Sequence, residues 1–197
     1  MKKLLALTAV ALMAFSVSAM AQVDPDADGM GIYFDVGGTQ LHKAPLAGFE
    51  AVNVYLLLTR GSGEQVLGYE ARIVQELSVA GAGAWVTTGI DADNDPLDLA
   101  IGYGTGLPNT GAPVVLASMQ FFAMPGNTAS FGVSGIPGSI SFPEGPGYVH
   151  TVGVKTPCQV PTGVPGAFHA CMGPLGTYCM PGVGNEDMSW SQMKALY

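Results

Sequence analysis

Apolar residues along most of this chain either alternate with polar ones or form short blocks, and glycine and proline separate the blocks. Residues 66–77 alternate most clearly, and one face of an extended strand there carries Tyr69, Ala71 and Ile73. This pattern predicts a strand with one buried face. Residues 50–59 (EAVNVYLLLT) are apolar and rich in β-branched side chains, and they end in the turn sequence RGSG.

The same reasoning predicts seven further strands, at 32–36, 84–88, 97–103, 114–124, 129–134, 138–142 and 148–154. Eight or nine short strands without a helical period predict an all-β fold, an antiparallel β-sandwich of Greek-key or jelly-roll type. Residues 114–124 are apolar on both faces, so we expect this strand to be central and covered on both sides.

Composition divides the chain into five segments. They are a signal peptide (1–21), an acidic N-terminal segment (22–29), the β-sandwich (30–156), a segment rich in proline, glycine and cysteine (157–184) and a short C-terminal helix (185–197). Trp190, Met193 and Tyr197 share one face of that helix. A helix of about ten residues is not stable alone in water, so we expect this face to dock on the sandwich.

The first segment has a basic start, an apolar run over 4–17 and the cleavage sequence Ala19-Met20-Ala21. It predicts a secreted protein, whether periplasmic, at the cell surface or extracellular. Five basic and fifteen acidic residues follow it, which gives a net charge of −10. So acidic a chain disfavours binding to nucleic acid or to an anionic membrane surface, and no later stretch is long and apolar enough to span a membrane.

All three cysteines lie in the last forty residues. In an oxidising compartment we expect one disulfide. Spacing does not determine the pairing; our prediction is Cys158 with Cys171, which closes a loop of about a dozen residues.

Two acidic clusters have the oxygen-rich character that calcium requires. The first contains Asp24, Asp26 and Asp28 before a glycine, and the second contains Asp91, Asp93, Asp95 and Asp98 between two predicted strands. Both have a second interpretation. The first cluster also fits a flexible acidic N-terminus, which the absence of a preceding helix favours, and the second also fits a solvated turn. Calcium is therefore the one cofactor that the sequence suggests.

The sequence gives little support to an enzyme. It has three histidines and none of the common hydrolase or phosphate-binding motifs. Glu50, Glu70 and Glu76 are the carboxylates considered for a glycosidase pair. Glu70 and Glu76 share a polar strand face, but they lie about 20 Å apart in an extended chain, which is too far for one site. Trp85 and Tyr103, with Tyr69, could form a sugar-stacking platform, although core packing is the favoured role for aromatics in strands.

Several pieces of the chain resemble a group of uncharacterised secreted bacterial proteins, each with a signal peptide and one β-sandwich. They are GIYFD, VNVYLLLT, GYEARI, PVVLASMQF and the closing NEDMSWSQMKALY. The resemblance implies the fold and an acidic, Trp-containing C-terminal tail, but no biochemical role. The strand pattern is also similar to that of cohesin-type sandwiches, which implies attachment to another protein.

The sequence thus leads to three functional hypotheses. The first is a secreted, non-catalytic module for attachment, surface structure or assembly, with a protein or polysaccharide partner at the cell surface. The second is a carbohydrate-binding module, which needs exposed coplanar aromatic rings. The third is a secreted hydrolase, which needs carboxylates or a Ser/His pair in one pocket.

Overall fold

A computed structural model describes residues 26–44, 47–93 and 95–173. Within these ranges the chain forms twelve β-strands and no helix, and therefore no helix that could span a membrane. The predicted signal peptide and the predicted C-terminal helix lie outside the described residues. The all-β prediction and the prediction of two sheets are confirmed.

The smaller sheet, sheet A, has the strand order β1-β3-β8-β5. Its strands are β1 (Gly29–Tyr33), β3 (Glu50–Thr59), β8 (Val114–Ala123) and β5 (Gly81–Ala82). All three of its strand pairings are antiparallel. Sheet A carries the candidate site described below.

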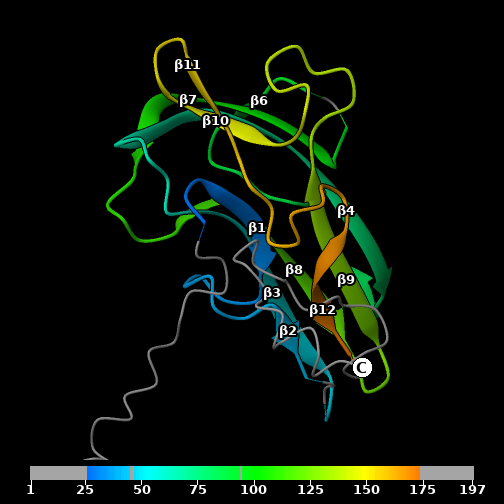
Figure 1. The fold of residues 1–197 in the computed structure, drawn as a ribbon. Coiled ribbons are helices and arrows are strands. Elements are labelled where there is room, and N and C mark those ends of the chain that lie inside the picture. The colour runs from blue at the N-terminus through cyan, green and yellow to red at the C-terminus, as the bar shows by residue number, and fades with distance from the viewer. Residues whose placement is uncertain (1–25, 45–46, 94, 174–197) are drawn as a thin grey trace, which may run out of the picture.

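The larger sheet, sheet B, has the order β11-β10-β4-β9-β12-β2, with β7 paired to β4 and β6 to β7. Its strands are β11 (Val154–Pro157), β10 (Gly147–Thr151), β4 (Gln65–Ser78), β9 (Thr128–Ser134), β12 (Phe168–Met172), β2 (His42–Lys43), β7 (Asp98–Pro108) and β6 (Ile90–Asp91). Figure 1 shows β6, β7, β10 and β11 gathered at one end of the molecule, while β9 and β12 lie beside sheet A.

Alternation predicted the inner faces correctly. Tyr69, Ala71 and Ile73 of β4 are buried in one apolar core, and β3 has the predicted bounds. This core also contains the alternate residues Val52, Val54, Leu56 and Leu58 of β3. A strand with one face in the core alternates in this way because successive side chains point to opposite faces.

Other boundaries were predicted wrongly, in each case near glycine or proline. Residues 84–88 make one isolated bridge, and 138–142 form no strand but begin in a turn at 136–139 in which Gly138 has a positive φ. Residues 148–154 are a hairpin, β10 and β11, rather than one strand, and Gly153 lies in its turn with φ 80°. The segment rich in proline and glycine contributes β12, and β2 was not predicted.

The prediction that 114–124 is covered on both faces is wrong. β8 is internal in its sheet, between β3 and β5, but its burial alternates. Leu116, Met119 and Phe121 are buried, whereas Val115 and Phe122 are 40% and 41% exposed. The outward apolar residues of this strand therefore face solvent.

A β-bulge in β8 joins the two sheets by hydrogen bonds. Leu56 and Leu57 pair with Ala117 and Val115, so Leu116 is the extra residue opposite β3. Its carbonyl accepts hydrogen bonds from the hydroxyls of Tyr69 (3.3 Å) on β4 and Tyr103 (3.4 Å) on β7. A bulge residue stands outside the regular ladder, so its backbone groups are available to other partners.

A second bulge joins β12 to the edge of sheet A. Phe168 and Ala170 pair with consecutive residues of β9, which leaves His169 as the extra residue. The buried His169 side chain turns to β1, where its Nε2 accepts a hydrogen bond from the Ile32 amide at 2.9 Å.

Neighbouring amides on the same edge of β1 are also paired. The Met30 amide donates to the Gln159 carbonyl (2.7 Å), and the Phe34 amide donates to the Gln40 carbonyl (2.8 Å). The edge of β1 is thus closed to other strands.

This arrangement requires a neutral imidazole at position 169, because a protonated Nε2 cannot accept a hydrogen bond. Burial lowers the pKa of His169 from 6.5 to about 4. Between these two pH values the unfolded chain binds a proton that the folded chain does not. Stability is therefore full above pH 6.5 and falls as the pH decreases towards 4.

We expect His169 to make the protein lose roughly 3 kcal/mol of unfolding free energy between pH 7 and pH 4. Chemical denaturation across this pH range measures the loss. The control is His169→Gln, whose amide oxygen can accept from Ile32 without titrating, and its curve is expected to be flatter. Parallel curves for the two proteins would show that His169 does not carry this pH dependence.

Candidate interaction surface

The outward face of sheet A is formed by cross-strand pairs of β3 and β8. The pairs are Ala51 with Phe122, Asn53 with Gln120, Tyr55 with Ser118 and Leu57 with Val115. We call these eight residues the outer face; Leu57, at one end of it, is buried, and Tyr55 and Ser118 are half-buried. They share one side of the sheet because paired residues in antiparallel strands point the same way. Gln120 Nε2 donates to Asn53 Oδ1 at 3.0 Å in its middle.

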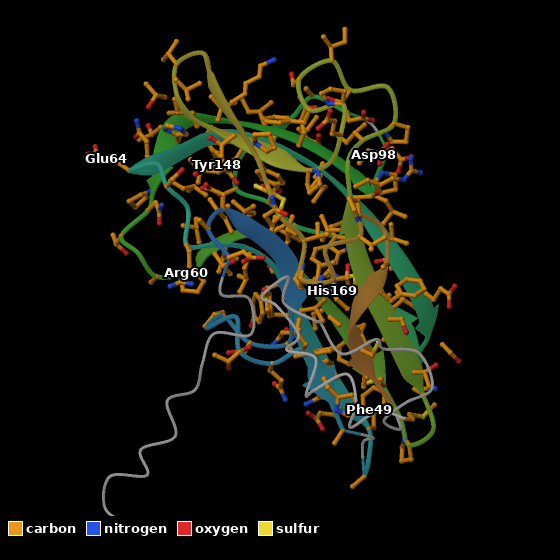
Figure 2. The ribbon with its side chains drawn as sticks, in the orientation of Figure 1. Phe49, Arg60, Glu64, Asp98, Tyr148 and His169 are labelled. Atoms are coloured by element: carbon orange, nitrogen blue, oxygen red, sulfur yellow. The ribbon has the colours of Figure 1, made fainter. Side chains whose placement is uncertain are left out.

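Aromatic rings mark one end of the outer face. Phe49, one residue before β3, is 67% exposed, and its ring stacks on that of Phe122 with centroids 5.6 Å apart and planes 4° from parallel. Figure 2 shows Phe49 at the opposite end of the molecule from Tyr148 and Glu64. The pair therefore exposes apolar surface to solvent.

No residue of the outer face is charged, although the chain has 15 acidic and 7 basic residues. Next to it, Lys43 Nζ and Glu50 Oε1 form a salt bridge at 3.0 Å. Protein interfaces are distinguished by a core that lacks charge and is enriched in aromatic residues. The outer face has both properties.

The β5 side of sheet A is an edge without charge. Gly81 and Ala82 are exposed and pair with Phe122 and Phe121, and residues 79–89 include no charged side chain or proline. Charged side chains and prolines are the usual protection of an exposed edge strand. This edge lacks them, whereas the edge of β1 is closed by His169 of β12 and by the carbonyls of Gln159 and Gln40.

The second acidic cluster forms a turn. The Oδ1 atoms of Asp91, Asp93 and Asp95 each accept the amide two residues further along, at 2.9–3.1 Å. Asp98 is buried and pairs with Arg72, whose Nε lies 3.4 Å from Oδ1. Burial raises the pKa of Asp98, and Arg72 opposes that shift. These contacts match the turn interpretation.

The first acidic cluster is divided by the structure. Asp24 lies outside the described residues and Asp26 has an interaction partner. Asp28 is anchored rather than flexible: its Oδ1 accepts from the Tyr148 hydroxyl (2.6 Å) and the Ser62 amide (2.7 Å). Burial, and then the hydrogen bond to Asp28, raise the pKa of Tyr148.

Among the described residues, no group of three or more His, Cys, Asp or Glu side chains is arranged to hold a metal ion. The calcium hypothesis therefore stays a prediction from sequence alone.

The aromatics proposed for a sugar platform pack inwards. Trp85 and Tyr103 are partly buried against the core, and Trp85 contacts Phe131 edge-on with centroids 6.3 Å apart. The Trp85 indole donates to Gln75 at 3.1 Å, and Tyr69 is buried. These contacts support the favoured interpretation, core packing.

The structure does not bring together the three glutamates considered for a glycosidase pair. Glu50 lies in sheet A beside Lys43, while Glu70 and Glu76 lie in β4 of sheet B. Glu70 accepts a hydrogen bond from Ser139.

Cys158 has a free thiol, so the predicted disulfide between Cys158 and Cys171 is wrong. Cys171 is disulfide-bonded, and its partner is not among the described residues. Cys158 lines a hollow of about 420 Å³ together with Phe142 and Pro146. Burial raises the pKa of the Cys158 thiol, and so does the charge of Asp28, which leaves it protonated and a poor nucleophile.

No protein-family model and no curated protein matches this chain. Among solved structures, it is similar to the sixth cohesin from scaffoldin B of Acetivibrio cellulolyticus, determined in complex with a Cel5 dockerin mutant. The two chains are 12% identical with a TM-score of 0.40 over 75% of this chain and 99% of the cohesin.

Sequence reasoning missed the outer face. The sequence does show polar Asn53 in the otherwise apolar β3, and the structure pairs it with Gln120 of β8 on the side that carries the exposed Phe122. An apolar run on both faces of a strand indicates either a buried strand or an exposed apolar surface, and the sequence alone does not separate them.

Calcium discriminates between the two interpretations of the second acidic cluster: the turn interpretation, in which Asp91, Asp93 and Asp95 accept backbone amides, predicts that millimolar calcium leaves the melting temperature unchanged relative to EDTA. Calorimetry in the two buffers measures this. Binding of an ion would stabilise the folded state by about 2.7 kcal/mol at 100 times Kd, so a clear rise in melting temperature would contradict the turn interpretation.

Proposed function

We propose that this protein is a secreted, non-catalytic β-sandwich module that attaches to a protein partner through the outer face of sheet A. The supporting observation is the outer face itself, uncharged and bordered by the exposed Phe49–Phe122 stack in an acidic chain. Exposed apolar patches on soluble proteins commonly mark sites of interaction. Secretion is supported by the leader-like sequence of residues 1–21.

The shape of the surface favours a protein over a polysaccharide. Phe49 and Phe122 stack on each other, so the pair presents one ring face rather than two coplanar rings side by side. The open β5 edge next to Phe122 adds unpaired backbone groups, which an extended protein segment can pair with. Together the edge and the outer face offer backbone and side-chain contacts to one partner.

The experiment introduces a charge into the middle of the outer face. Gln120→Lys changes an exposed side chain whose partner, Asn53, is also exposed, so the fold is expected to persist. The matched control is Gln65→Lys, the same change at an exposed position of β4 in sheet B. A partner is first captured from culture medium with the wild-type chain, identified, and then titrated against all three proteins.

We expect Gln120→Lys to weaken binding at least about tenfold, because the interface would bury an unpaired charge, and Gln65→Lys to leave it unchanged. Equal affinities for the three proteins would contradict the proposed surface. Binding on a glycan array that Gln120→Lys abolishes would replace the protein partner with a carbohydrate.

A further inference from the structure

The exposed apolar residues of the molecule include a cluster at one end of sheet A. Phe49 and Phe122 stack there, and Met124, immediately after β8, is 46% exposed. We call these three residues the aromatic end. The described residues leave large parts of all three side chains in contact with solvent, which is unfavourable unless something covers them.

The described chain stops close to this cluster. Gly173, just after β12, donates its amide to the Lys43 carbonyl at 3.2 Å, and its own carbonyl bonds to Nε2 of His42 at 2.8 Å. The Nζ atom of Lys43 forms a salt bridge with Oε1 of Glu50 at 3.0 Å.

Glu50 lies next to the aromatic end in the sheet. It directly follows Phe49, and it pairs with Ala123, the residue between Phe122 and Met124. Gly173 is therefore connected to the neighbourhood of the aromatic end through Lys43 and Glu50.

Residues 174–197 begin at this point, and their sequence suits the surface. Trp190, Met193 and Tyr197 are spaced to share one helical face, two aromatic rings and one methionine. A short helix needs a surface to pack against, and the aromatic end is apolar, exposed and close to where the segment starts.

We propose that residues 185–197 dock on the aromatic end, with Trp190, Met193 and Tyr197 packed against Phe49, Phe122 and Met124. The segment then covers the Phe49–Phe122 end of the outer face, and the part left for the proposed partner is the Asn53–Gln120 pair with the β5 edge. The support for this docking is the position of Gly173, the last described residue, and it does not depend on the proposed partner.

A double-mutant cycle in the full-length secreted chain tests the contact. Phe122→Ala and Trp190→Ala are made singly and together, and the equilibrium constant for unfolding is measured by denaturation. Phe122 is partly exposed, so its truncation is compatible with folding. The control cycle replaces Phe122→Ala with Val154→Ala, a 43% exposed residue of β11 in sheet B.

We expect each of Phe122→Ala and Trp190→Ala to raise the unfolding constant about tenfold, and the double variant to raise it little further. In the control cycle the two effects should multiply. Multiplied effects in the Phe122 cycle would overturn the proposal.

The measurement is repeated at a tenfold higher protein concentration, with size-exclusion chromatography. An unchanged unfolding constant and a monomer support docking within one chain. A concentration-dependent dimer lost on Trp190→Ala would place the segment on a second copy and overturn the proposal. The Gln120→Lys titration reports separately on the proposed partner surface, so the two proposals can fail independently.

Discussion

Two β-bulges fix how the sheets face each other. In β8 the bulge at Leu116 frees a carbonyl for two tyrosine hydroxyls, and in β12 the bulge at His169 turns an imidazole towards the Ile32 amide of β1. A buried polar group without a partner is costly, so each bulge is tolerated because the opposite sheet satisfies it. These hydrogen bonds are directional, so they fix the position of one sheet relative to the other, which apolar packing alone does not specify.

The same bonds divide the surface of sheet A into closed and open parts. Its inner face is in the core, and along the edge of β1 the amides of Met30, Ile32 and Phe34 bind groups outside the sheet. Ala51, Asn53, Gln120 and Phe122 of the outer face are exposed, and so is the short edge at β5, whereas Leu57 at the other end of the outer face is buried. The proposed attachment surface is therefore the part of sheet A that the fold does not use for its own stability.

The sequence predicted the core well and the hydrogen bonds between the sheets poorly. Alternation placed Tyr69 and Ile73 in the core correctly, because a one-residue shift would expose the whole strand face. Nothing in the local pattern marks Leu116 or His169 as bulge residues, since each bulge is defined by a strand distant in sequence. Asp28 was interpreted from neighbouring aspartates, yet its partner Tyr148 lies 120 residues away.

Hydrogen–deuterium exchange of the free chain and of its complex with the captured partner shows which face of the sandwich the partner covers. We expect added protection to be confined to the amides of residues 51–55, 79–86 and 115–120, with β4, β10 and β11 unchanged. Protection on β10 and β11, or none on sheet A, would contradict this expectation.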